Sequence, residues 1–294
     1  MELSCADRVL VLDQPVVMGV LNVTPDSFSD GGHYLHADAA LAHAERIAAE
    51  GAAIIDIGGE STRPGSAGID SEEELRRVLP VVERVAARLP LLISIDTSNP
   101  QLMRRAAAAG AHMINDVRSL RVAGAMEALA ASTLGVCLMH MRGEPADMQL
   151  NPQYTDVVGE VRSYLAARVQ ACLAAGIARA RLAVDPGFGF GKALAHNLEL
   201  LRRLAEFRQL ALPLAVGLSR KSMVAALSAA APGAERGAGG LREQRLAGSV
   251  ALATIAVLQG AQIVRAHDVA ATVDAVRIAS VFKPVASSGG VDRA

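Results

Sequence analysis

Short apolar runs with the character of β-strands alternate along this chain with longer amphipathic runs. Apolar runs of this kind are typical of strands buried on both faces, as in a parallel sheet covered by helices. Eight predicted strands alternate strictly with eight helical stretches within 294 residues, which predicts a single (β/α)8 barrel of the α/β class. A doubly wound open sheet is the alternative, because one sequence does not reveal strand order. The predicted strands span 16–23, 52–58, 91–97, 112–117, 135–140, 181–187, 213–219 and 261–268.

Local signals indicate where the helices begin and end. Ser71 followed by Glu74 predicts a capping box at the start of a helix over 71–89. A glycine followed by an apolar residue predicts helix ends at Gly51, Gly110, Gly176 and Gly260. The Gly/Ala-rich stretch 231–243 reads as an insert. We expect a barrel over residues 1–283 and a disordered tail over 284–294.

Composition and charge exclude several classes of protein. The net charge is −1 and the pI is near 6.7, which argues against a nucleic-acid partner or an acidic membrane surface. No apolar run approaches the roughly 18 residues of a membrane span. The first residues include Asp7 and Arg8 and make a poor signal peptide. Three cysteines without metal-site spacing indicate reduced thiols in a cytoplasmic protein: Cys5, Cys137 and Cys172.

Polar residues gather at the carboxyl ends of the predicted strands, which is where barrels carry their chemistry. They are Asn22, Asp56, Asp96, Asn115, Asp116, His140, Asp185, Ser219, Arg265 and His267. Strand ends are polar wherever they meet loops, but that explanation covers only one or two such cases. The pattern therefore predicts one shared site at the mouth of the barrel.

Cationic residues near these strand ends predict an anion site. The loop 58–66 offers glycine N–H groups and Arg63, and Arg265 and His267 share one face of a strand. Together they suggest an anion such as pyrophosphate. Lys221 and Ser222 open a helix, which also favours anions. The segment 185–192 lacks the Walker spacing, so we interpret its glycines as a flexible turn over the mouth.

Aromatic residues make up only 3% of the chain, so their positions are informative. Three of the five phenylalanines fall in predicted mouth loops rather than in core helices. We interpret Phe28 and Phe190 as ligand contacts. For Phe188, a ligand contact and a local packing role remain equal alternatives.

Taken in order, these segments resemble the dihydropteroate synthase family of folate biosynthesis. The resemblance covers nearly the whole predicted barrel, and its only departures are the insert at 231–243 and Ala266. The matching segments are "GVLNVTPDSFSDGG", "IIDIGGESTRPG", "SIDT", "INDV", "MHMRGEPADMQ", "DPGFGFGK", "GLSRKS" and "GSVALATIAVLQGAQIVRAHDV".

The resemblance implies a transferase that condenses 6-hydroxymethyl-7,8-dihydropterin pyrophosphate with p-aminobenzoate, giving 7,8-dihydropteroate and pyrophosphate. It also implies magnesium, inhibition by sulfonamides and a homodimer formed through late helices. Pyrophosphate would leave first, and the arylamine would then attack a methylene cation.

The resemblance also implies a role for individual residues. Catalytic roles fall to Asp26, Asp30, Asp96 and Lys221, and pterin contacts to Asp96, Asn115, Asp185 and Lys221. Pyrophosphate contacts fall to Thr62, Arg63, Arg265 and His267, and a magnesium contact to Asn22. The p-aminobenzoate pocket would contain Phe28, Thr62, Pro64, Phe190 and Ser222.

Two other functions remain open from the sequence. A pterin-binding methyltransferase, of the methionine synthase or corrinoid type, would share the barrel and the pterin contacts. It needs no pyrophosphate site, so Arg63, Arg265 and Lys221 argue against it. A non-catalytic paralogue would usually lack some of the site residues, whereas this sequence has all of them.

Overall fold

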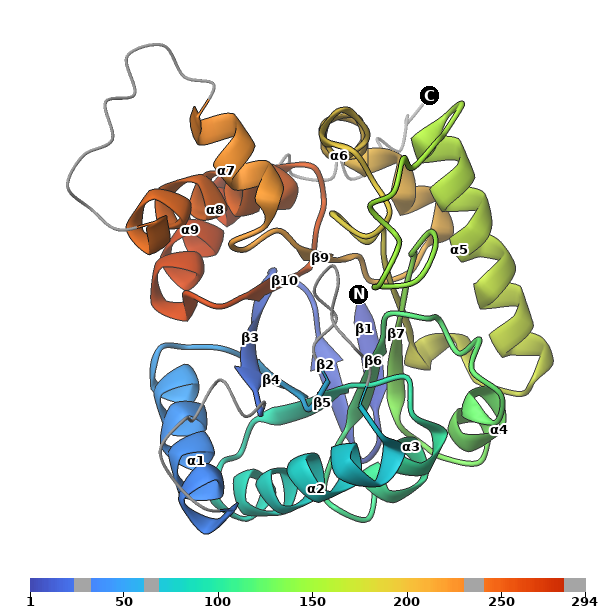
Figure 1. Cartoon of the computed structure of the whole chain (residues 1–294), viewed down its shortest axis with the longest axis vertical. Helices are drawn as coiled ribbons and strands as arrows, with labels where there is room; N and C mark the ends of the chain where they lie inside the picture. Colours follow the sequence, from blue (N-terminus) through green and yellow to red (C-terminus); the bar gives the residue numbers. More distant parts are fainter. Residues whose placement is uncertain (24–32, 61–68, 230–240, 283–294) are drawn as a thin grey trace, which may run out of the picture.

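The structure is a computed structural model, and it describes residues 1–23, 33–60, 69–229 and 241–282. A ring of parallel strands lies at its centre, and helices surround the ring (Figure 1). The barrel strands are β3 (Val16–Asn22), β4 (Ile54–Gly58), β5 (Leu92–Asp96), β6 (Met113–Asp116), β7 (Gly135–Met139), β8 (Leu182–Asp185), β9 (Ala215–Gly217) and β10 (Ile263–Ala266).

Strand order identifies the sheet as a barrel. The hydrogen-bonded order is β8-β7-β6-β5-β4-β3-β10-β9, with every neighbouring pair parallel. A parallel bridge between Val184 and Leu214 joins the two end strands. The predicted (β/α)8 barrel is confirmed, and the open-sheet alternative is wrong, because the eighth sequential strand pairs with the first.

The helices pack against the outward-facing strand residues. Glycines at all four predicted helix ends have positive φ, from 88° to 109°, so those helix ends are confirmed. The helices are α1 (His33–Ala49), α2 (Ser71–Arg88), α3 (Pro100–Ala106), α4 (Ala125–Ala130), α5 (Val157–Ala174), α6 (Leu194–Arg202), α7 (Ser222–Ala229), α8 (Leu241–Leu258) and α9 (Val269–Val281), with 3-10 turns at Arg179–Arg181 and Leu204–Leu210. No helix within the described ranges is both long enough and apolar enough to cross a membrane.

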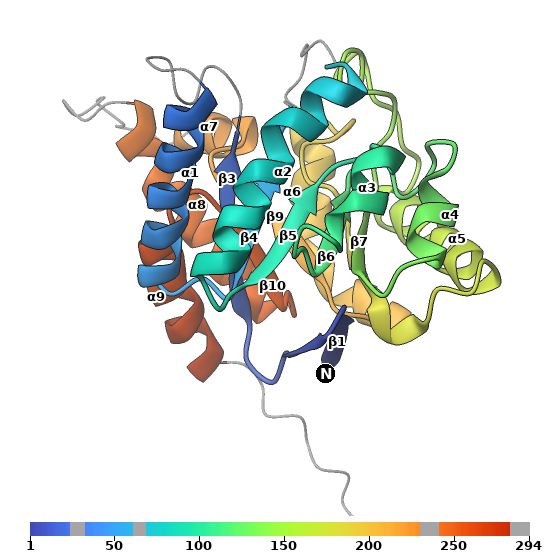
Figure 2. The same cartoon turned by 90° about the horizontal axis from the view of Figure 1, so that it is seen from below.

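An antiparallel hairpin that the sequence did not predict closes the amino end of the barrel. It consists of β1 (Glu2–Cys5) and β2 (Arg8–Val11), and Figure 2 shows β1 beyond the ends of the barrel strands. Leu3 and Cys5 of β1, and Leu12 directly after β2, are buried against one residue from each barrel strand. Those eight residues are Met18, Ile54, Leu92, Met113, Cys137, Ala183, Ala215 and Ile263.

The barrel interior changes from apolar to polar one step toward the carboxyl end. Residues two apart on a strand share a face, so the next inward layer follows that apolar layer by two positions. This polar layer includes Asp56, Ser94, Asn115, Asp185 and Arg265. The alternation of the strands therefore places charged groups inside the barrel, with an apolar floor beneath them.

The start of α2 differs from the prediction. Its N-cap residue is Asp70, without a side-chain cap bond, so the capping box predicted at Ser71 and Glu74 is wrong. Glu74 is instead buried, and its carboxylate accepts a hydrogen bond from Thr97 Oγ1 at 2.7 Å. Most of the predicted insert at 231–243 and the whole predicted tail at 284–294 lie outside the described residues.

Candidate active site

Arg265 reaches from β10 across the barrel interior to two carboxylates. Its Nε donates to Asp56 Oδ2 on β4 at 2.6 Å, and its Nη2 donates to Asp96 Oδ2 on β5 at 2.7 Å. Asp56 is fully buried and Asp96 nearly so. Buried charges of this kind must be paired to be tolerated, so the three side chains form one electrostatic unit.

Two polar atoms near this unit are left without a hydrogen-bond partner in the part of the chain that the structure describes. Asn115 Nδ2 donates to Asp56 Oδ2 at 3.1 Å, so this oxygen accepts two hydrogen bonds. The other oxygen, Asp56 Oδ1, and the hydroxyl of Ser94 are buried without a hydrogen-bond partner among the described residues. Buried polar atoms rarely stay unpaired, which indicates that water or a ligand enters this layer.

Burial and ion pairing act against each other on these groups. Burial raises the pKa of Asp96 above its ordinary range, although the positive charge of Arg265 opposes the shift. Burial alone would lower the pKa of Arg265, but Asp56 and Asp96 outweigh it and raise that pKa. Arg265 therefore stays protonated at every pH at which the protein folds.

Asn22 and Asp96 lie on either side of Gly58. A Cβ built on Gly58 would lie 3.8 Å from Asn22 Oδ1 and 3.8 Å from Asp96 Oδ2, so glycine keeps space open between these two oxygens. No cluster of three or more potential metal-binding side chains occurs in the described part of the chain. One amide oxygen beside one carboxylate fits magnesium held mainly by substrate phosphates and water.

Lys221 lies above the polar layer, between β9 and α7. Its Nζ donates to the carbonyl of Phe188 and lies 4.7 Å from the centre of the Phe190 ring. Burial lowers the pKa of Lys221 to about 8, although Asp185 opposes the shift. The side chain thus carries a positive charge at neutral pH close to Asp185 and Arg265.

Asp185 ends β8 and faces the interior. Its Oδ1 accepts the backbone N–H of Gly187 at 2.7 Å, so one oxygen already shapes the turn that follows the strand. Burial raises the pKa of this carboxyl, and Lys221 opposes the shift.

His267 follows Arg265 by two positions on the β10 side of the mouth. Its backbone N–H and its ring Nδ1 both contact the hydroxyl of Ser219, at 3.2 and 3.1 Å. The adjoining turn is held by Arg220, which forms a two-point ion pair with Asp268. Ser222 is the first residue of α7, as the sequence predicted.

Two of the strand-end polar residues turn away from the interior. Asp116 accepts hydrogen bonds from Ser98 Oγ and from the backbone N–H groups of Arg118 and Leu120, so it shapes the turn after β6. His140 packs edge-on against Tyr164, with ring centres 4.9 Å apart. Burial, followed by the charge of Lys192, lowers the pKa of His140 to about 2, so its ring is neutral.

Two residues of this region were not assigned a role from the sequence. The sequence marked Asp56 only as one of several polar residues at strand ends. In the structure it pairs with Arg265 across the barrel interior. Lys192 is almost fully buried and contacts His140, with its pKa lowered well below the ordinary value by burial. Phe188 is fully buried in the core, which settles its role as packing, whereas Phe190 lies partly buried on a cluster of methionines.

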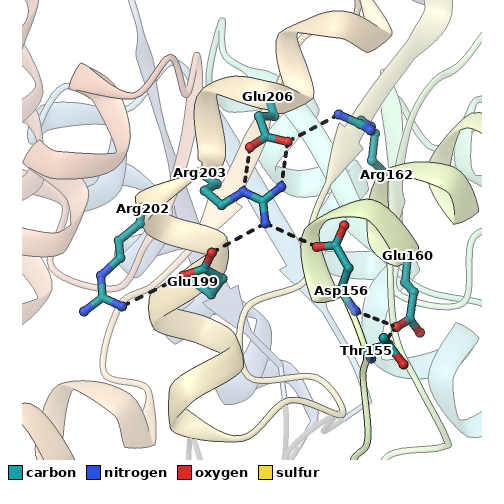
Figure 3. A network of polar contacts seen from close by, with 8 residues as sticks. All are labelled: Thr155, Asp156, Glu160, Arg162, Glu199, Arg202, Arg203 and Glu206. Carbon is teal, nitrogen blue, oxygen red and sulfur yellow. Dashed lines mark hydrogen bonds and ion pairs between the residues drawn. The ribbon is translucent and has the colours of Figure 1, made fainter.

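A surface network fixes the helices that flank this region. The Arg203 guanidinium, just after α6, contacts Glu206, Asp156 and Glu199 (Figure 3). Glu160 of α5 accepts the backbone N–H groups of Thr155 and Asp156. Each exposed pair contributes little by itself. The network nevertheless joins the start of α5 to the end of α6.

Six of the predicted site residues lie outside the described residues. They are Asp26, Phe28, Asp30, Thr62, Arg63 and Pro64. Their roles remain predictions. The described part brings together Asn22, Asp96, Asn115, Asp185, Lys221, Phe190 and Arg265, with His267 and Ser222 at the rim.

Known proteins of one family resemble this chain. A family model described as pterin binding enzyme matches residues 18–267. A dihydropteroate synthase of Escherichia coli K12 is 52% identical over 278 residues, which cover 95% of this chain and 95% of that protein.

Two solved structures are also similar. A Yersinia pestis dihydropteroate synthase in a sulfonamide drug complex has 50% identity and a TM-score of 0.88, covering 97% of this chain and 100% of the other. A Xanthomonas albilineans dihydropteroate synthase in complex with 7,8-dihydropteroate has 45% identity and a TM-score of 0.82, covering 97% and 99%.

The pairing of Arg265 predicts a pH-dependent loss of stability. Arg265→Met leaves Asp56 and Asp96 buried without their partner, which costs about 3–5 kcal/mol at pH 8. The folded-state pKa of Asp96 already lies above its unfolded value and rises further in the variant. The buried Asp96 carboxylate therefore destabilises the variant most at a pH above the pKa that Asp96 has in the unfolded chain. This destabilisation shrinks as the pH falls and Asp96 is protonated. Urea unfolding should show a smaller loss at pH 5 than at pH 8.

Arg88→Met is the matched control, because Arg88 pairs with Glu45 at 3.0 Å on the surface. It should lose less than about 1 kcal/mol at either pH. An equal loss for Arg265→Met at both pH values would show that Asp96 does not depend on Arg265.

Proposed function

The chain belongs to the dihydropteroate synthase family of pterin-binding enzymes, and on that basis we propose a role for each element of its site. The enzyme is a transferase that joins 6-hydroxymethyl-7,8-dihydropterin pyrophosphate to p-aminobenzoate. The C–O bond to pyrophosphate breaks, a C–N bond to the arylamine forms, and the amine loses one proton. Its named relatives favour this reaction over the methyl transfer considered as the alternative.

The polar layer inside the barrel is the observation that supports a pterin site. A pterin presents the 2-amino group and N3–H as parallel donors, together with ring acceptors. Asp185 can accept the two donors, and Asn115 can both donate and accept. Asp96 accepts the remaining ring donors, and Lys221 donates to the acceptor side of the ring. The unpaired Asp56 Oδ1 and Ser94 Oγ could each make a further hydrogen bond.

The pyrophosphate binds above this layer, on the cationic side of the mouth. Arg265 on β10 supplies positive charge, and His267, just after β10, supplies its ring. Thr62 and Arg63 are assigned to the same anion. Arg265 is also bound to Asp56 and Asp96, so it links the pyrophosphate site to the pterin site. Magnesium, held by Asn22 and phosphate oxygens, would neutralise charge on the leaving group.

The p-aminobenzoate binds against Phe190, with Ser222 at the start of α7 holding its carboxylate. Phe28, Thr62 and Pro64 complete this pocket. Sulfonamides resemble p-aminobenzoate in shape and charge and compete for the same place, and a sulfonamide complex is known for the Yersinia pestis relative.

Catalysis depends on position and charge rather than on a strong base. The amine of p-aminobenzoate is neutral at pH 7, so it attacks without prior deprotonation. Asp96 and Lys221 hold the ring whose electrons stabilise the methylene cation, and we assign Asp26 and Asp30 to stabilising the same cation. Fixed charges of this kind stabilise the transition state more than the bound substrate.

Helices α8 and α9 provide the surface for a homodimer. They expose the large apolar side chains Ile255, Leu258, Ile278 and Val281, and Phe282 is exposed directly after α9. A monomeric mass in sedimentation analysis would contradict this assignment. We place the enzyme in the cytoplasm, where the free thiols of Cys5, Cys137 and Cys172 stay reduced.

Asp185→Asn tests the pterin site. The amide oxygen can still accept the Gly187 N–H, so the turn and the melting temperature should change little. The new NH2 group faces a pterin donor, and one charge-assisted bond of about 1.5–3 kcal/mol is lost. With the added donor clash, calorimetry should show pterin affinity falling by about a hundredfold or more.

Asp116→Asn is its matched control on the neighbouring side of the barrel. Both Asp116 oxygens accept backbone N–H groups, so the amide leaves two donors facing each other. This variant should lose stability, while its folded fraction binds pterin like the wild type. Retained pterin affinity in Asp185→Asn would remove Asp185 from the site.

Pyrophosphate and magnesium should promote pterin binding, because Arg265 contacts both parts of the site. Calorimetry should show pterin binding about tenfold more tightly with magnesium pyrophosphate than without it. Asn22→Leu should abolish this enhancement but keep the basal pterin affinity. Equal affinities for the wild type under both conditions would contradict the linkage of the two subsites.

A further inference from the structure

Lys192 is a buried lysine that the reaction described above does not use. It directly follows the glycine-rich loop, residues 187–191, which leads from β8 to α6, and its side chain is 2% exposed. Its Nζ donates to the carbonyl of Gly187 at 2.8 Å and to that of Phe190 at 2.9 Å. The ring Nδ1 of His140 lies 2.9 Å away. Lys192 therefore joins both ends of a tight turn to the segment that follows β7.

Every backbone carbonyl of the glycine-rich loop accepts a hydrogen bond from a side chain. Lys192 supplies two of these bonds. Lys221 donates to the carbonyl of Phe188, Gln149 to that of Gly189 and Tyr154 to that of Gly191. These bonds satisfy every carbonyl of the loop and restrain its backbone.

The glycines of this loop serve close packing, a role that the sequence did not predict. A Cβ at Gly187 would lie 1.9 Å from the carbonyl oxygen of His140, and one at Gly191 would lie 2.1 Å from that of Arg142. Both glycines also have positive φ, 70° and 62°. The loop is thus pressed against the segment after β7, and Lys192 lies at that contact.

The choice of lysine here is notable in this chain. Of its 29 basic residues only three are lysines, at positions 192, 221 and 283. The carbonyls of Gly187 and Phe190 and the ring Nδ1 of His140 lie 2.8–2.9 Å from Lys192 Nζ. This arrangement suits a compact ammonium group with three rotatable donors. The planar guanidinium of arginine has a different shape and does not replace it.

The loop decides where Phe190 lies relative to Lys221. The Phe190 ring lies 4.7 Å from Lys221 Nζ, and both residues are tied to the loop by their own backbone or side-chain bonds. Asp185, by contrast, is anchored by β8 and by its own bond to Gly187. A loosened loop would therefore move Phe190 more than it moves Asp185.

We propose that Lys192 is a positioning residue that sets the p-aminobenzoate site through Phe190. This inference rests on the proposed function, which places p-aminobenzoate against that ring. Lys192 touches neither substrate, because it is buried beneath the loop. Its role is to hold the Phe190 carbonyl, and with it the ring, at the distance from Lys221 that the arylamine requires.

Steady-state kinetics of Lys192→Met tests the proposal, since methionine keeps the length and removes the donors. The KM for p-aminobenzoate should rise about tenfold or more, because small displacements of a positioning group have large effects. The KM for the pterin pyrophosphate should change less than about threefold. A lysine that only stabilises the fold would lower the active fraction and leave both KM values unchanged.

Three further variants separate a loss of stability from a displaced Phe190 and from a wrong pocket assignment. Val82→Ala, a buried truncation on α2, should reduce stability without changing either KM. Tyr154→Phe removes the hydroxyl that donates to Gly191 and that also interacts with Arg142. It should raise the KM for p-aminobenzoate by a few-fold, which tests whether the loop positions Phe190 if Lys192→Met does not fold. Phe190→Ala tests the underlying assignment.

If Phe190→Ala leaves the KM for p-aminobenzoate unchanged, the proposed pocket itself is wrong. If Phe190→Ala raises that KM but Lys192→Met and Tyr154→Phe do not, the pocket stands and the proposal for Lys192 fails. If Lys192→Met raises the KM for the pterin pyrophosphate as much as the KM for p-aminobenzoate, the proposal for Lys192 also fails. The loop would then hold Asp185 as strongly as Phe190.

Discussion

One guanidinium inside the barrel sets the charge of the whole site. Arg265 crosses the interior from β10 to reach Asp56 on β4 and Asp96 on β5, which are not its neighbours in the sheet. Two carboxylates and an arginine can lie this deep only because they neutralise one another and because an apolar floor excludes water from below. The same pairing leaves Asp56 Oδ1 without a hydrogen-bond partner among the described residues, so this oxygen can accept one further hydrogen bond.

The site follows from one property of a strand, the alternation of its faces. Inward residues two apart form successive layers, so the apolar layer around Met18 and Ile54 is followed by the layer of Asp56, Asn115 and Asp185. Above that layer, the glycine-rich loop after β8 carries Phe190, and Lys221 lies against it. A pterin in the polar layer and an arylamine against Phe190 would therefore meet near Lys221, which is where the new bond has to form.

Much of the fold and part of the site could be predicted from the sequence, because they follow from patterns among residues close together in the chain. The eight barrel strands, the glycines that end the helices and the polar strand ends all depend on residues close together in the chain. The same alternation would have excluded Asp116, which is adjacent to Asn115 and so faces the other side. The pairing of Arg265 with Asp56, 209 residues apart, was not accessible, since it depends on strand order. Nor was the hairpin at the amino end, whose two strands pair with each other and stand outside the alternation of strands and helices.

The central claim is that this barrel joins a pterin to p-aminobenzoate, and product formation tests it most directly. The purified protein is incubated with magnesium, 6-hydroxymethyl-7,8-dihydropterin pyrophosphate and p-aminobenzoate, and both products are measured by mass spectrometry and a phosphate assay. The account predicts 7,8-dihydropteroate and pyrophosphate in equal amounts, with no dihydropteroate when either substrate is omitted. Folded protein that binds both substrates but forms no dihydropteroate would contradict it.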